Sequence, residues 1–145
     1  MTTAWQLTID CAAPARLAQF WAGALGYVPS PVPEGFPSWD AWFDEHGVPQ
    51  DERDTGAFLS DPGARAPSLS FLQVPEPKSG KNRLHLDLRV SGGRHLPWQQ
   101  RWERIGAEVE RLVGLGARVV EEIGPEGRPD HVVLADPEGN EFCVV

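Results

Sequence analysis

The sequence is poor in cysteine, in basic residues and in long apolar runs. Its two cysteines, Cys11 and Cys143, are too few for a disulfide framework, and we interpret both as cytosolic thiols, with a disulfide between them left open by the sequence. The 13 basic residues are outnumbered by 21 acidic ones, which gives a net charge of −8 and disfavours nucleic acid and anionic membranes as partners. No apolar run has the length of a membrane span, and residues 1–5 lack the basic and apolar segments of a secretion signal. We therefore expect a cytoplasmic protein.

The size and composition are those of an ordinary globular chain. With 145 residues, of which 41% are hydrophobic, it suits one domain or two small halves that share one core.

Hydrophobic periodicity predicts two similar halves, joined by a loop over 75–83. Two segments alternate between apolar and polar residues, which predicts a half-buried strand in each. Each predicted strand is followed by a predicted helix, in which apolar residues at helical spacing come after Pro14 or Pro97 and continue up to a glycine. The predicted strands of the first half lie at 6–11, 39–43, 56–60 and 68–74, with a proline-rich loop before the second, and those of the second half at 85–90, 117–123, 131–135 and 140–145.

The order β-α-β-β-β thus occurs twice, and an Asp-Pro turn precedes the last strand of each half. These turns are Asp61-Pro62 and Asp136-Pro137. We predict an α+β fold: one domain over 1–145, made of repeats 4–74 and 83–145, whose helices lie outside one concave mixed sheet with a cleft. The alternative is one irregular α+β domain whose halves resemble each other by chance.

The matched first strands place polar residues on the face that their helix does not cover. In the second repeat these residues are His85, Asp87 and Arg89. If the halves join edge to edge, such polar rows line one cleft, which is the usual form of a ligand site. The alternative is a face that is simply solvated.

The doubled unit, the run Leu84-His85-Leu86-Asp87 and the terminal run 136–142 (DPEGNEF) resemble the vicinal oxygen chelate superfamily. That superfamily groups glyoxalase I, bleomycin-resistance proteins and extradiol dioxygenases, and the run 74–87 is similar to its glyoxalase-like branch. The resemblance extends over nearly the whole chain and is specific for the fold, whereas one fold hosts many reactions.

The resemblance implies metal ligands on the first and last strands of each unit. The corresponding positions are Gln6, His85 and Cys143, with Phe71 at the fourth, where the register could slip by one; phenylalanine cannot bind a metal. Glu141 shares a strand face with Cys143 and is a further candidate. The metal would be Zn, Ni, Mn or Fe. The alternative is that His85 is a hydrogen-bonded wall residue and Cys143 a small buried residue, which is the more common role of such residues.

Other residues are candidates for contacting a ligand. Trp39 and Trp42, with Phe43, would form an aromatic lid or pack in the core; Phe71 would contact the ligand; and Asp87 and Arg89 would orient it or pair with each other. A basic cluster, Lys78, Lys81 and Arg83, would hold an anion or lie in a solvated loop.

Two functions remain open at this point. One is a metal-dependent lyase, isomerase or dioxygenase acting on a substrate with two adjacent oxygens. The other is a metal-free protein that binds or sequesters a small antibiotic-like molecule. Phe71 favours the second, and His85 supports the first. The resemblance also allows a homodimer, in which the cleft closes between two chains.

Overall fold

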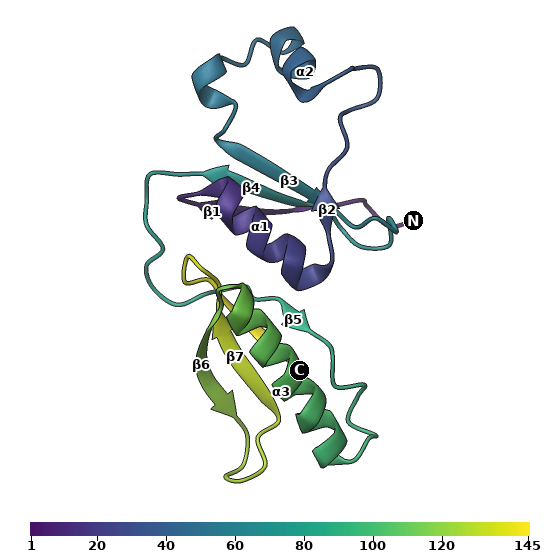
Figure 1. The fold of residues 1–145 in the computed structure, drawn as a ribbon, viewed down its shortest axis with the longest axis vertical. Helices are drawn as coiled ribbons and strands as arrows, with labels where there is room; N and C mark the ends of the chain where they lie inside the picture. Colours follow the sequence, from purple (N-terminus) through teal and green to yellow (C-terminus); the bar gives the residue numbers. More distant parts are fainter. The chain divides into compact units, whose positions relative to one another are not determined.

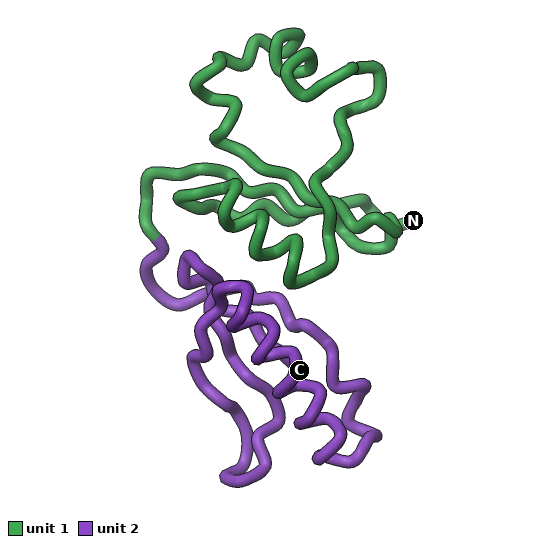
Figure 2. Tube along the Cα trace, in the orientation of Figure 1, with its two compact units in different colours: residues 1–77 green, residues 78–145 purple.

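The computed structural model describes residues 1–145 and divides them into two compact units, unit 1 (1–77) and unit 2 (78–145), shown in Figure 2. The division falls inside the loop that the sequence places between the repeats. Each unit is described by itself. No helix has both the length and the apolar character that crossing a membrane requires.

Unit 1 is a four-stranded mixed sheet with one long helix (Figure 1). Its strands run in the order β1-β4-β3-β2, where β1 is parallel to β4 and the other neighbours are antiparallel. The helix α1 covers the sheet at β3 and β4. The elements are β1 (Leu7–Cys11), α1 (Pro14–Leu25), β2 (Val28–Pro29), α2 (Trp39–Glu45), a 3₁₀ turn η1 (Gln50–Glu52), β3 (Gly56–Ser60) and β4 (Leu69–Gln73).

Unit 2 repeats this topology. Its strands run in the order β5-β8-β7-β6, again with the first strand parallel to the last and the other neighbours antiparallel. The helix α3 packs against β6, β7 and β8. The elements are β5 (Asp87–Leu88), α3 (Trp98–Leu115), β6 (Arg118–Ile123), β7 (His131–Ala135) and β8 (Glu141–Val144).

The two long helices begin and end for the same local reasons. Pro14 is the first residue of α1 and Pro97 immediately precedes α3, where the missing proline N–H costs no helical hydrogen bond. Gly26 and Gly116 follow the helices in the left-handed conformation, with φ of 71° and 116°. On the buried faces lie Leu17, Phe20 and Trp21 of α1 and Ile105 and Leu112 of α3. The predicted helices are confirmed.

The repeated Asp-Pro turns share one hydrogen-bonding scheme. The carboxylate of Asp61 accepts hydrogen bonds from the N–H groups two and four residues later, Gly63 and Arg65, at 2.9 and 2.8 Å. The carboxylate of Asp136 does the same with Glu138 and Asn140, both at 2.9 Å. In each case a short polar side chain holds the turn before the last strand of the unit.

The segment 39–43 corrects one prediction, because it belongs to a helix and not to a strand. Ser38 caps α2 by accepting a hydrogen bond from the N–H of Ala41 at 3.1 Å. Trp39, Trp42 and Phe43 are three and four residues apart, a spacing that places them on one face of a helix. The strand prediction gave weight to the β propensity of aromatic residues and overlooked this spacing.

The fold class is confirmed: an α+β protein of two tandem βαβββ units, each with its own mixed four-stranded sheet. In both units one sheet face packs under the helix, and we call the opposite one the open face. In unit 1 the strand register places Ile9 opposite Phe71 on the helix-covered face. In unit 2, Leu134 lies opposite Phe142 on the corresponding face, and both are buried.

Candidate metal and ligand site

The open face of unit 2 carries a group of potential metal ligands, His85, Asp87 and Cys143. The register pairs Asp87 of β5 with Cys143 of β8, so both side chains lie on the same face of the sheet. His85 lies two residues before Asp87 and therefore on that face as well. The alternate residues, Leu86 and Leu88, are turned toward the core, and Leu88 is buried.

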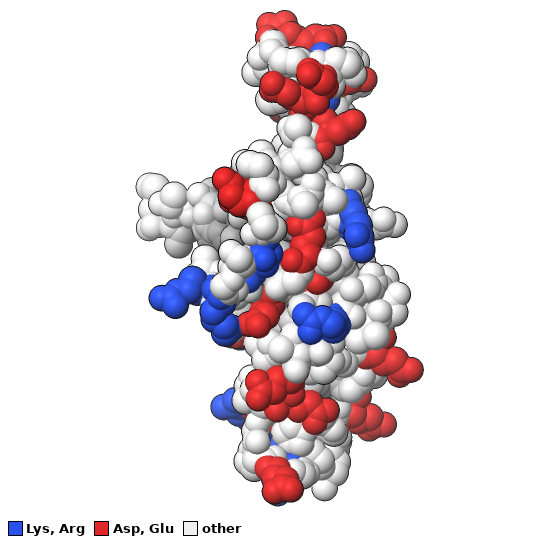
Figure 3. All heavy atoms as spheres, turned by 90° about the vertical axis from the view of Figure 1, so that its left-hand side faces the viewer, with Lys and Arg blue, Asp and Glu red and all other residues white.

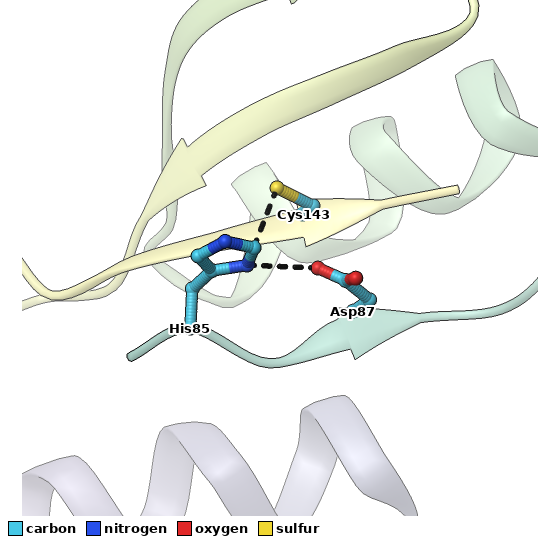
Figure 4. Close-up of side chains that lie close together, drawn as sticks. All are labelled: His85, Asp87 and Cys143. Atoms are coloured by element: carbon cyan, nitrogen blue, oxygen red, sulfur yellow. Dashed lines mark hydrogen bonds and ion pairs between the residues drawn. The ribbon is translucent and has the colours of Figure 1, made fainter. Parts of the chain in front are cut away.

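The side chains of these three residues converge, as Figure 4 shows. Nδ1 of His85 lies 2.9 Å from Oδ1 of Asp87 and 3.9 Å from Sγ of Cys143. One ligand atom from each residue falls within 4.8 Å of the others. An imidazole nitrogen, a thiolate and a carboxylate oxygen are the three ligand types found in zinc sites. The donor set of this group therefore fits a transition metal.

The three residues differ in their access to solvent. Cys143 is buried, whereas the side chains of His85 and Asp87 are 49% and 47% exposed. A metal held here would have the sulfur on its buried side and solvent on the other side. That arrangement leaves room for a further ligand, as in catalytic zinc sites with three protein ligands.

The Cys143 thiol is not activated as a nucleophile. Burial raises its pKa, and the charge of Asp87 together with a hydrogen bond to that carboxylate raises it further. In addition, Asp87 and Cys143 both approach Nδ1 of His85, whereas a catalytic triad needs them on opposite ring nitrogens. The geometry therefore favours metal binding over nucleophilic chemistry.

Glu141, the further candidate ligand, is engaged elsewhere. Its carboxylate pairs with Nζ of Lys81, and the hydrogen bond from Lys81 is the main cause of its lowered pKa. Lys78 donates a hydrogen bond to the carbonyl of Gly80 at 2.6 Å. Two of the three residues of the basic cluster thus have partners within unit 2, while Arg83 is exposed.

Phe71 does not occupy the position that the sequence assigned to it. It pairs with Ile9 on the helix-covered face of unit 1 and is only 1% exposed, so it belongs to the core. The register makes Ser70, opposite Thr8, the counterpart of Cys143. Counting residues from a turn of different length shifted the predicted position by one, which in a strand moves a side chain to the other face.

The remaining predicted residues lie in both units. Gln6 immediately precedes β1 in unit 1 and is exposed, and Arg89 is exposed just after β5 in unit 2. Trp39 and Trp42 lie on α2 in unit 1, where Trp39 stacks on Phe58 with ring centroids 5.4 Å apart. The ionic partner of Asp87 is His85, whereas the sequence suggested Arg89.

Sequence reasoning missed Asp87 as a potential metal ligand and considered it a residue that orients a bound molecule or pairs with Arg89. The signal was available in the spacing His85-Leu86-Asp87, because residues two apart in a strand share a face. The parallel pairing of β5 with β8 was the missing information, since it brings Cys143 directly beside Asp87.

The fold agrees with the comparison with protein families. The model of the glyoxalase-like domain matches residues 6–145. The chain therefore belongs to the glyoxalase-like domain family, within the vicinal oxygen chelate superfamily. No curated protein sequence matches the chain.

Solved structures show the same fold at low sequence identity. A possible glyoxalase from Bacillus cereus is 14% identical with a TM-score of 0.59, covering 100% of this chain and 99% of that one. A glyoxalase/bleomycin resistance protein/dioxygenase family enzyme from Burkholderia phytofirmans is 13% identical with a TM-score of 0.58, covering 96% and 94%. A mutant of the fosfomycin resistance protein FosX from Listeria monocytogenes, complexed with Mn(II) and 1S,2S-dihydroxypropylphosphonic acid, is 12% identical with a TM-score of 0.60, covering 99% and 89%.

Proposed function

We propose that this protein binds a divalent transition metal on the open face of unit 2 and uses it on a small molecule with two adjacent oxygens. The observation that carries the proposal is the convergence of one ligand atom each from His85, Asp87 and Cys143 within 4.8 Å. A metal bound there would supply Lewis acidity to the substrate oxygens. The reaction class would be that of a lyase, isomerase or dioxygenase.

The ligand set favours particular metals. A cysteine sulfur is a soft ligand that suits zinc or iron better than manganese, and His85 is compatible with zinc, iron and nickel. The chain's own residues would hold the ion through Nδ1 of His85, Sγ of Cys143 and a carboxylate oxygen of Asp87. Because the Cys143 thiol has a raised pKa, metal uptake should displace a proton and become tighter as the pH rises.

A second candidate function is metal-free binding of a small molecule. It is favoured by the hydrogen bond between His85 and Asp87, which satisfies both side chains without an ion. In that case the polar group would recognise the ligand through hydrogen bonds, and Cys143 would remain a protonated, buried thiol.

Metal content decides between the two candidates. Untagged protein purified without a chelator would be analysed by inductively coupled plasma mass spectrometry, beside His85→Ala and Cys143→Ser variants. The matched control is His95→Ala, which removes an exposed histidine of unit 2 outside the group. We expect near-stoichiometric metal in the wild type and in the control, and loss of metal in both ligand variants.

Cobalt substitution tests the role of the sulfur directly. We expect Co(II) added to the metal-free protein to give a thiolate-to-cobalt charge-transfer band that is lost in Cys143→Ser. Absence of metal in the wild type, with no uptake of Zn, Ni, Mn or Fe(II), would refute the metal proposal and leave the metal-free one. If the metal is found, catechols and glutathione adducts of dicarbonyl compounds would be the first substrates to test.

A further inference from the structure

A pocket of about 500 Å³ lies in unit 1 between the helix α1, the strand β3 and the helix α2. Its volume is in the range of sites that hold small molecules, roughly 300–1,000 Å³. All of its lining residues belong to unit 1, so it shares no residue with the group His85, Asp87 and Cys143. The function proposed above gives this pocket no role.

One wall of the pocket is built from small side chains. Ala15, Ala18 and Ala22 of α1 line it and recur every three or four residues, so they share one face of the helix. An alanine side chain is a single methyl group, so these positions of α1 fill little of the space beside the helix.

The facing wall is aromatic and incompletely covered. It contains Trp39 and Phe43 of α2 together with Phe58 of β3. Trp39 stacks on Phe58 with an interplanar angle of 14°, yet no residue of α2 is fully buried and Phe58 is 41% exposed. Large rings that remain partly exposed beside a cavity can bury further area against a flat ligand.

The charge around the pocket disfavours anions. Arg53 is the one charged lining residue, and it is neutralised by Asp40, with N and O atoms 3.2 Å apart, and by Asp44. The segment 39–54 carries six acidic residues and this single arginine, a net charge of 1 − 6 = −5. Figure 3 shows the acidic side chains gathered over α2 and η1 at the top of the view. A negative potential beside aromatic rings attracts cations.

We infer that the pocket between α1, β3 and α2 is a second ligand site that takes a planar aromatic cation. The rings of Trp39, Phe43 and Phe58 supply stacking and cation–π attraction, the alanines supply room, and the acidic segment supplies the charge preference. Binding at this pocket does not require the metal.

The test uses thioflavin T as a planar aromatic cation and anilinonaphthalene sulfonate as an aromatic anion. Fluorescence titration of the full chain should show one thioflavin T per chain, with affinity that falls as salt is added because the acidic segment becomes screened. Ala15→Phe fills the pocket from an exposed position of α1. We expect it to weaken thioflavin T binding by at least about tenfold, the loss of roughly one stacking contact.

The control is Ala107→Phe, which adds the same ring at an exposed alanine of α3. It should bind thioflavin T like the wild type, and so should His85→Ala, which separates this site from the proposed metal site. Circular dichroism melting would verify that Ala15→Phe is folded, and Trp39→Leu would give a second loss of binding from the opposite wall.

Three results would overturn the existence of the site, and a fourth would overturn its preference for cations. One is no thioflavin T binding to the wild type. The second is equal binding to Ala15→Phe and the wild type. The third is that the wild type sediments as a dimer, that Ala15→Phe sediments as a monomer, and that neither binds thioflavin T. The pocket would then hold part of a second chain. Tighter binding of anilinonaphthalene sulfonate than of thioflavin T would overturn the assignment to cations.

Discussion

Units 1 and 2 share one topology but differ in the chemistry of their open faces. Where unit 2 has Asp87 beside Cys143, the register of unit 1 has Thr8 beside Ser70. Hydroxyl groups are poor ligands for transition metals, whereas a carboxylate and a thiolate are good ones. The comparison teaches that both units have the same scaffold, whereas only unit 2 carries the group of potential metal ligands.

The largest effect that tests this comparison is expected from Phe71→Ala. If Phe71 belongs to the core of unit 1, its loss should lower the free energy of unfolding by about 3–5 kcal/mol. The control is Leu72→Ala, one residue further along β4 on the open face and 47% exposed, with an expected change within about 0.5 kcal/mol. Urea unfolding measures both. Similar losses from the two variants would contradict the assignment of faces.

The next effect is a difference in metal affinity between a substitution in unit 2 and a substitution in unit 1. We expect His85→Ala to weaken zinc binding by at least about 100-fold, since even outer-shell changes at metal sites cost up to that factor. Gln6→Ala should change it less than about threefold, because unit 2 supplies all three ligands in our proposal. Competition with a fluorescent zinc chelator measures both. A large loss in Gln6→Ala would show that the ligand set inferred from unit 2 is incomplete.

A smaller difference should appear at the repeated turns. Asp136 is only 4% exposed, so replacing it with alanine removes charged hydrogen bonds to Glu138 and Asn140 and should cost about 2–3 kcal/mol of stability. Asp61→Ala should cost less, because that turn is more open to water. Urea unfolding of both variants provides the measurement, and equal losses would remove the distinction between the two turns.

The smallest effect concerns an ion cluster of unit 2. Burial raises the pKa of Asp130, but hydrogen bonds from Arg94, His131 and Arg101 outweigh it and leave the pKa below its usual value. A lowered folded-state pKa stabilises the protein above the pKa of the unfolded state and loses that contribution as the pH falls through the folded-state value.

Asp130→Asn should therefore cost about 1 kcal/mol at neutral pH and progressively less in acid. Urea unfolding of the wild type and the variant at pH 7 and at about pH 2.5, below the usual carboxyl range, gives the comparison. The exposed Glu126→Gln serves as control. A loss that is undiminished at low pH would mean that packing, and not charge, is what Asp130 contributes.

Much of the fold could be predicted from the sequence because periodicity and turn chemistry are local. The strands 56–60 and 131–135 have the predicted bounds, and both long helices end at the predicted glycines. The helix α2 was missed because strand propensity was preferred to the helical spacing of Trp39, Trp42 and Phe43. Local rules succeed wherever propensity and spacing agree.

The candidate site was only partly predictable. His85 and Cys143 were named from the resemblance, but Asp87 gained its role from pairing between strands that are far apart in the sequence. The same dependence on register moved Phe71 to the core. Side-chain neighbours across a sheet are set by register, which one sequence leaves open to an error of one residue.

The parallel pairing within each sheet also sets an order for folding. The only sheet neighbour of β1 is β4, and that of β5 is β8, so in each unit the first strand to be synthesised pairs with the last. A nascent chain must therefore keep β1 unpaired until residues 69–73 have left the ribosome, and β5 until residues 141–144 have done so. Because these contacts are distant in sequence, the first strand is expected to join each sheet late, and it stays available to other partners until then.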